Sequence, residues 1–365
     1  MGFDERRTAF LYKMIIKGRV EKSRKAIEMK RFILIVVICA LGFFQTARFT
    51  VEAAEDKDLV LSTEKGKSLT WGTDSNYLDI GLGYLFSRGH CAWEISYPDQ
   101  SGRSRSTLEF RGMGSNIPIL FLDINHPNSL VTLNVQFGKG QSTTGEGTDT
   151  DYQSGTLFHR SRFDLTGDTA FWITDIQTTF ASTSRPRWVL KPFLGWHHYE
   201  EKISMANGLW TTLYGVETNM PFDGLGSRYD FNWDALRMGI KGELELFTPP
   251  QKAIEAIKLK GQLAFFPFMH FRGRGVWNLR DDLKQDPSFS HEADNFGVLG
   301  MDGTFSLAYQ PLKFLELECG ARIFYFRVQD GTDLTFFSND TIATVTLNEA
   351  NALRIGLYLQ ITGRF

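Results

Sequence analysis

The chain has 365 residues and a formal net charge of −2 at pH 7. This near-neutral charge, without a basic stripe, gives no support to nucleic-acid binding, and we expect no nucleic acid as a partner. Mean hydropathy is −0.21, which excludes a bundle of membrane helices but suits strands of alternating polarity. Aromatic residues make up 14% of the chain, a high share that is typical of barrels with aromatic girdles at both membrane interfaces.

The pattern of residues in the N-terminal region indicates an export signal. A basic segment at 29–31 precedes an apolar run at 32–44, and small residues follow up to Ala53. This order is typical of a signal peptide cleaved near Ala53, and the run is shorter than the roughly 20 residues of a membrane-spanning helix. We interpret 1–53 as an upstream extension plus signal peptide, with Met29 as the true start, and 54–365 as the mature domain. A cytoplasmic tail with an anchor helix is the alternative.

The last segments of the chain predict membrane strands. From 353 to 365 the apolar residues alternate with polar ones, and the chain ends on Phe365. Successive side chains of a strand point to opposite faces, so one face here is apolar and the other carries charge. In a water-soluble sandwich the apolar face would point to the core. An apolar strand that ends on an aromatic residue is instead typical of barrels in the outer membrane of Gram-negative bacteria, with lipid on the apolar face. We interpret Phe365 as the signal for membrane assembly.

Similar alternation recurs at 131–137, 236–246 and 257–265. Four short turns, at 125–128, 184–186, 248–250 and 310–313, separate some segments, and longer polar stretches separate the others, at 98–105, 139–157, 205–226, 278–295 and 330–347. Because short and long connections alternate, we predict an all-β protein, a closed antiparallel transmembrane β-barrel of ten strands. Its short turns and both termini are expected on the periplasmic side and its long loops outside the cell. Strands at 227–247 and 257–277 exceed the 9–11 residues that a bilayer requires.

Motifs for metal or cofactor binding are not found in the sequence. It has no metal-ligand spacing, no P-loop and no Gly-x-Ser-x-Gly, so we expect no cofactor and no metal. Adjacent strand residues face opposite sides, so His197 and His198 cannot chelate one metal, and we place both in an interface belt. Only Cys91 and Cys319 follow the predicted cleavage site, and the sequence leaves open whether they pair.

The order of features resembles the omptins, ten-stranded endopeptidases of the outer membrane, over about 78–365. The similarity rests on four segments: 102–111, near the second strand; 148–152, in the second long loop; 194–199 followed by 207–208, near the fifth strand; and 280–283, in the fourth loop. The group named for the Protochlamydia outer membrane protein, which includes porin-like members, is related to omptins, and this chain could belong near it.

The omptin resemblance implies a degenerate catalytic site. By position, Asp149 and Asp151 match the family's aspartate pair, and Asp281 matches the aspartate of its aspartate–histidine dyad. The histidine position holds Leu283, which can neither accept a proton nor orient water. His291, which we place in the same loop, is a candidate substitute.

We therefore predict a barrel that is not a working protease, with a structural role, a binding role at the cell surface or a narrow pore. Large residues predicted to point inward, such as Phe324 and Arg322, favour a filled lumen over a wide channel. The alternative is an omptin-type endopeptidase with altered catalytic residues. The expected partners are outer-membrane lipid or lipopolysaccharide, the barrel-assembly machinery and an external ligand at the loop rim.

Overall fold

The computed structural model describes residues 77–97, 104–125, 131–184, 187–247, 256–297 and 300–365. The signal peptide and the start at Met29 fall outside these residues and stay predictions. Thirteen strands make up the described fold: β1 (Leu78–Ser96), β2 (Arg105–Asn125), β3 (Val131–Gln153), β4 (Thr156–Thr178), β5 (Ala181–Ser184), β6 (Arg187–Leu213), β7 (Val216–Phe222), β8 (Arg228–Phe247), β9 (Ala256–Val276), β10 (Phe289–Phe296), β11 (Met301–Leu312), β12 (Leu315–Phe336) and β13 (Ile342–Arg364).

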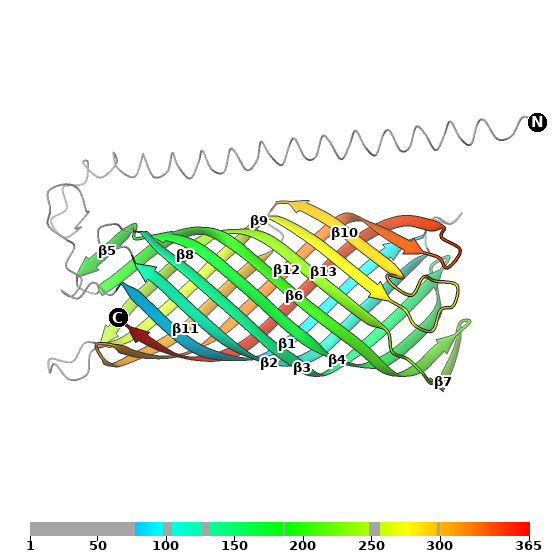
Figure 1. Cartoon of the computed structure of the whole chain (residues 1–365), viewed down its shortest axis with the longest axis horizontal. Helices are drawn as coiled ribbons and strands as arrows, with labels where there is room; N and C mark the ends of the chain where they lie inside the picture. The colour runs from blue at the N-terminus through cyan, green and yellow to red at the C-terminus, as the bar shows by residue number, and fades with distance from the viewer. Residues whose placement is uncertain (1–76, 98–103, 126–130, 185–186, 248–255, 298–299) are drawn as a thin grey trace, which may run out of the picture. The chain divides into compact units, whose positions relative to one another are not determined.

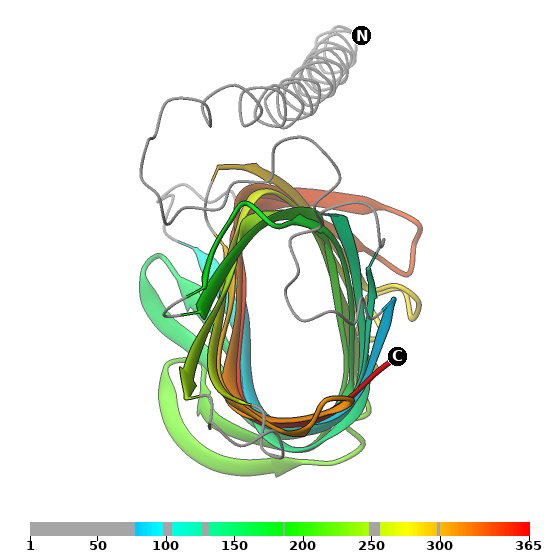
Figure 2. The same cartoon turned by 90° about the vertical axis from the view of Figure 1, so that its left-hand side faces the viewer.

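The strands close into one antiparallel ring (Figure 2). β1 pairs with β2 on one side and with β13 on the other, which joins the two ends of the described chain. β10 and β11 both pair with β9 and β12 and share one position in the ring. The short β5 and β7 pair only with β6. The ring therefore has ten positions, and the prediction of a closed ten-stranded barrel is confirmed.

The two ends of the barrel differ, as Figure 1 shows in side view. One end, here the terminal end, holds the start of β1 and the end of β13, where the Tyr77 amide donates to the Phe365 carbonyl oxygen at 2.8 Å. β11 and β12 also join there, through residues 313 and 314 alone. The opposite end, here the distal end, carries the β6–β7 hairpin and the connection at 277–288. Both termini of the barrel domain thus lie beside a short turn, as predicted.

An apolar belt surrounds the terminal half of the barrel. On β13 the side chains of Ile355, Leu357 and Leu359 are exposed, whereas Arg354 is buried inside, so the predicted facing of the last strand is confirmed. Neighbouring strands add further exposed apolar residues at the same height: Ile80, Leu82, Phe86, Leu120, Phe137, Ile176, Ile240, Leu263, Phe305 and Leu307. In the distal half the outward positions include Arg88, Arg111, Lys139 and Arg162 instead. The belt is the surface that a bilayer would cover. Among the described residues no helix is long and apolar enough to span a membrane.

Much of the sequence predicted as long loops is strand in the structure. Residues 139–157 are strand apart from a turn at 154–155, and most of 205–226 forms the end of β6 and all of β7. The connection at 277–288 is a true loop. The prediction failed because polar residues were read as loop, although a strand that rises above the bilayer meets water on its outer face and needs no apolar residues there.

A bulge in β3 changes which residues face the lumen. In the terminal half of β3 the even-numbered residues point inward, for example Asn134 and Gln136, both buried. Between Ser142 and Glu146 the register against β4 shifts by one residue. One extra residue in a strand reverses its alternation, so the odd-numbered residues point inward beyond the bulge. Asp149 and Asp151 therefore face into the barrel.

Candidate functional site

The lumen of the distal half is filled by an apolar core. Aromatic rings from several strands meet there, with centroid distances of 5.3 Å for Trp93 and Phe110, 4.4 Å for Trp233 and Phe271, and 5.3 Å for Tyr199 and Phe326. All of these side chains are buried. We call this cluster the aromatic layer; it resembles the core of a water-soluble domain, enclosed by the strands of the barrel itself.

Beneath the aromatic layer lies Arg354, whose side chain reaches across the lumen to partners on other strands. It donates hydrogen bonds to the Tyr199 hydroxyl at 2.8 Å, to Ser87 Oγ at 3.0 Å and to Thr169 Oγ1 at 3.3 Å, and it forms an ion pair with Glu201. Its partners come from β1, β4 and β6, so one side chain of β13 connects distant parts of the wall. Arg354 and Glu201 are both buried.

A second buried cluster, the central charge cluster, crosses the lumen close by. Asp302 lies 3.2 Å from Arg237 and 3.4 Å from Arg322, and Arg237 also lies 3.5 Å from Asp175. His197 belongs to this cluster, with Nδ1 3.8 Å from Asp302 Oδ2 and its side chain fully buried. The prediction that His197 lies in an interface belt was wrong, because its side of the strand faces the lumen. His198 faces outward, stacks on Trp172 and contacts Asp234.

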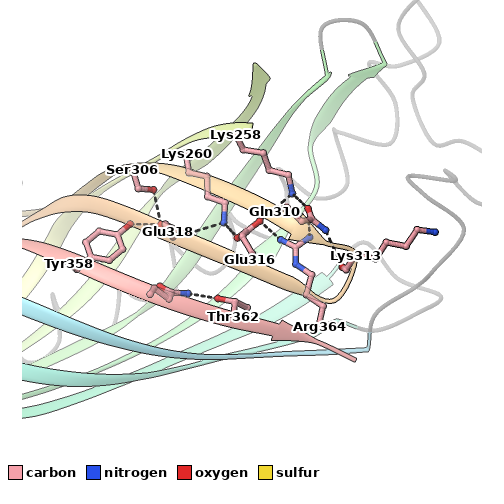
Figure 3. A network of polar contacts seen from close by, with 11 residues as sticks. Lys258, Lys260, Ser306, Gln310, Lys313, Glu316, Glu318, Tyr358, Thr362 and Arg364 are labelled. Carbon is pink, nitrogen blue, oxygen red and sulfur yellow. Dashed lines mark hydrogen bonds and ion pairs between the residues drawn. The ribbon is translucent and has the colours of Figure 1, made fainter. Parts of the chain in front are cut away.

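The terminal end of the lumen is polar (Figure 3). Glu316 accepts hydrogen bonds from Lys258 at 3.3 Å, from Lys260 and from Arg364. Glu318 accepts from Lys260 at 2.9 Å and from the hydroxyl groups of Ser306 and Tyr358. The alternation in β12 places both glutamates on its inner face, and Lys258 and Lys260 reach them from β9. We call this group the Glu316 network.

A cavity of about 200 Å³ lies next to the Glu316 network. Five acidic and five basic side chains are among the residues that line it: Asp79, Asp123, Glu243, Glu316, Glu318, Lys191, Lys241, Lys260, Arg322 and Arg364. The aromatic layer and the central charge cluster separate this terminal cavity from the distal end. The sequence predicted charged inner faces, but a lone strand pattern does not reveal where side chains leave space.

The distal mouth holds the carboxylates predicted from the omptin resemblance. Asp149 Oδ1 accepts a hydrogen bond from Ser106 Oγ at 3.5 Å, and Asp151 Oδ2 lies 3.9 Å from His159 Nδ1. Both aspartates lie on β3 rather than in a loop, which corrects the prediction. Desolvation inside the mouth and then the charge of Asp151 raise the pKa of Asp149 well above its usual range.

The raised pKa of Asp149 leads to a prediction about the stability of the barrel. The folded state holds the Asp149 proton more tightly than the unfolded state, so stability is lost as the pH rises through the folded-state pKa. We expect Asp149→Asn to shift the denaturant midpoint upward at pH 7 to 8, with the gain shrinking towards pH 4. Denaturant unfolding in detergent at several pH values measures this shift of the midpoint. The Asp168→Asn variant, which changes an exposed aspartate, is the control. An Asp149→Asn variant that is less stable at neutral pH would contradict the expectation.

The loop at 277–288 contains the other predicted residues. Asp281 is exposed, and Asp282 forms an exposed ion pair with Arg280 at 2.6 Å. Leu283 is buried, and its amide donates to the Arg280 carbonyl oxygen at 3.0 Å, while a bridge joins it to Phe337. Leu283 thus anchors the loop by packing. Among the described residues no contact joins Asp281 to the aspartates of β3, and their facing across the mouth stays a prediction.

His291 has a partner that the sequence did not suggest. It lies on β10 rather than in the loop, and its Nδ1 is 2.7 Å from Asp333 Oδ2 of β12. Both residues are buried, and the His291 ring stacks on Tyr229 with centroids 6.1 Å apart. Only the pairing of β10 with β12 brings the two together, and Asp333 lies in the polar stretch 330–347, whose composition predicts a loop.

The two cysteines that are described do not pair. Cys91 is buried in the lumen and Cys319 is exposed on the outer face.

A closed antiparallel ring, an outward apolar belt and a filled, partly charged lumen define an integral β-barrel of the outer membrane. Residues 80–361 match the sequence family described as Protochlamydia outer membrane protein, and the chain belongs to this family. In barrels of this class the end with the termini and short turns is periplasmic, so the terminal end described above is the periplasmic one. The distal end faces the outside of the cell.

One solved structure supports the fold. The chain is similar to the outer membrane protease OmpT from Escherichia coli, with 11% identity, a TM-score of 0.63, and coverage of 80% of this chain and 98% of that one. The translocator domain of the autotransporter NalP from Neisseria meningitidis also matches, with 11% identity, a TM-score of 0.29, and coverage of 80% and 90%. No curated protein matches. The predicted omptin-like barrel in the outer membrane is thereby confirmed.

Proposed function

We propose that the protein is a non-conducting, non-proteolytic barrel that presents its distal rim at the cell surface for binding. The observation that carries this proposal is the filled lumen. An ion moving through it would have to displace the central charge cluster, in which Arg237 and Asp302 are fully buried, and then the aromatic layer. Stripping water from an ion is costly in such surroundings, so passage would require large rearrangement of the wall.

Lipopolysaccharide is the proposed partner of the outer face. Arg88 and Lys139 are exposed immediately above the belt residues Phe86 and Phe137, at the height where lipid headgroups begin. Arginine and lysine side chains bind phosphate groups. Cationic side chains in this position support contact with an anionic lipid surface. The external ligand of the distal rim is a separate question.

The absence of proteolysis is proposed from the chemistry of the loop. Leu283 stands where the omptin resemblance calls for a proton acceptor, and its buried side chain holds the loop in place. His291 is the only described histidine paired with a buried carboxylate at the distal mouth, which supports the alternative of an altered protease. Against this alternative, the exposed fractions of His291 and Asp333 are 1% and 0%, so a substrate would not reach them without opening the mouth.

One preparation tests the proposal. The mature protein, refolded with lipopolysaccharide, is added to planar bilayers and assayed separately on a fluorogenic Arg-Arg peptide. We expect neither conductance steps nor cleavage. Stable channels in the bilayer would overturn the closed-lumen proposal, and cleavage that is lost in Asp281→Ala or His291→Gln would establish the protease alternative. Cleavage appearing only in Leu283→His would support a degenerate site.

A further inference from the structure

Two pairs of like charges face the periplasmic cavity. Asp79 lies directly opposite Asp123 in the β1–β2 pairing, and Lys191 lies directly opposite Lys241 in the β6–β8 pairing. All four residues line the cavity. Like charges directly opposite on neighbouring strands are destabilising. Strand stability therefore does not account for two such pairs of opposite sign on different walls of one cavity.

The four side chains leave their charges uncompensated by ion pairs. Within the described part of the chain, no acidic oxygen lies within 4.0 Å of the amino group of Lys191 or Lys241, and no cationic nitrogen lies that close to Asp79 or Asp123. Among the residues that the structure describes, Asp79 Oδ1 has no hydrogen-bond partner, and Asp123 accepts a hydrogen bond from Asn134 alone. Asp123 and Lys241 attract one another across the cavity without meeting.

Nearby charges do not cancel this arrangement. Arg364 lies opposite Asp79, but it donates to Glu316 of the Glu316 network. Glu243 follows Lys241 on the same face, lies opposite Lys260 and is attracted by the charges of Lys191, Lys260 and Lys241. Glu243 lowers the charge of the lysine wall from +2 to +1 without changing its sign. The cavity thus has an acidic wall on β1–β2 and a cationic wall on β6–β8.

We propose that the periplasmic cavity binds a small zwitterion. Its ammonium group would donate to Asp79 and Asp123, and its carboxylate or phosphate would accept from Lys191 and Lys241. The volume of about 200 Å³ lies below the roughly 300–1,000 Å³ of pockets for drug-sized ligands, so the ligand has the size of an amino acid. A simple anion would relieve the lysine pair but face the acidic wall, and a simple cation would do the reverse. Only a molecule with both charges satisfies both walls.

The fixed separation of the walls gives a sharp test. Isothermal titration of the detergent-refolded protein is performed with glycine, β-alanine, 4-aminobutyrate and 6-aminohexanoate, which carry the same two groups at increasing separation. Ethylamine and propionate carry one group each. We expect affinity to peak at one chain length and to be about tenfold or more weaker for each singly charged analogue, because hydrogen bonds to charged groups are the strong ones. No binding by any zwitterion, or equal binding of propionate and the best zwitterion, would overturn the proposal.

Variants place the ligand in the cavity. Lys241→Met and Asp123→Asn should each weaken the best zwitterion about tenfold, whereas the matched control Lys202→Met removes an exposed lysine on the distal half of β6 and should leave affinity unchanged. Heat-modifiable migration in gels shows that each variant is folded. Binding that is indifferent to both cavity variants would overturn the assignment of the site, whatever the behaviour of the distal rim.

A lipid headgroup could supply the same chemistry. Phosphoethanolamine is therefore titrated in detergent and in vesicles that contain or lack phosphatidylethanolamine. Weaker apparent binding only in the vesicles that contain this lipid would identify the lipid headgroup as the occupant. Equal binding in both kinds of vesicle would identify a soluble zwitterion.

Discussion

Replacement of Arg354 by methionine is expected to lower the free energy of unfolding of the barrel by about 3–5 kcal/mol, the effect of leaving one partner of a buried ion pair alone. Glu201 would keep its charge inside the lumen without a cation, and Tyr199, Ser87 and Thr169 would each lose a hydrogen bond donated by the guanidinium group. Urea unfolding of the refolded protein, followed by heat-modifiable migration, measures the loss.

The control for Arg354 is Arg327, which forms a partly exposed ion pair with Glu349 at 2.6 Å. Arg327→Met should cost no more than about 1 kcal/mol, because exposed pairs contribute little. The double variant Arg354→Met, Glu201→Gln should recover part of the stability by removing the stranded charge. Equal losses in Arg354→Met and Arg327→Met would show that the lumen arginine does not hold the wall together.

Replacement of Phe365 by serine is expected to reduce the amount of folded protein in the outer membrane several-fold while leaving refolding in detergent nearly unchanged. The Phe365 side chain is 69% exposed, and a surface substitution of this kind changes stability by roughly 0.5 kcal/mol or less. Its backbone carbonyl and amide, which pair with Tyr77 and Leu78, are kept in the variant. We propose that the terminal aromatic ring acts through recognition by the barrel-assembly machinery.

The experiment compares two amounts of folded Phe365→Ser protein. One is measured in membrane fractions and the other after refolding in detergent. An outward substitution of similar polarity on the belt, Leu357→Ser, serves as the control, since Leu357 lies on β13, which Phe365 directly follows, and its side chain is similarly exposed. If Phe365→Ser loses as much folded protein in detergent as in cells, its role is in packing rather than in assembly.

The membrane-facing half of this fold could be predicted from the sequence because lipid imposes a strict rule on it. The alternation of β13 and the bounds of β8 and β9, predicted at 227–247 and 257–277, agree with the observed Arg228–Phe247 and Ala256–Val276. Above the bilayer that rule no longer holds. Water outside the wall permits polar residues on strands, and so the polar stretch 139–157 predicts a loop although most of it is strand.

The candidate sites depended on information that a single strand does not carry. The inward facing of Asp149 depends on one extra residue in β3, and the pair of His291 with Asp333 depends on which strands are neighbours. The opposition of Lys191 and Lys241 requires the register between β6 and β8. Alternation is visible within a single membrane-facing strand, but register and bulges arise between strands, where sequence periodicity gives no signal.

Along a single strand, the apolar side chains change from the outward face, in the apolar belt, to the inward face, in the aromatic layer. On β13, Leu357 and Ile355 are exposed towards the belt side, whereas Leu347, Ala350 and Ala352, nearer the distal end, are buried inside. The strand therefore follows the solvation rule of a membrane protein at one end and that of a water-soluble protein at the other. On β13 the change falls near Arg354, and there the strand passes from lipid on its outer face to water on its outer face.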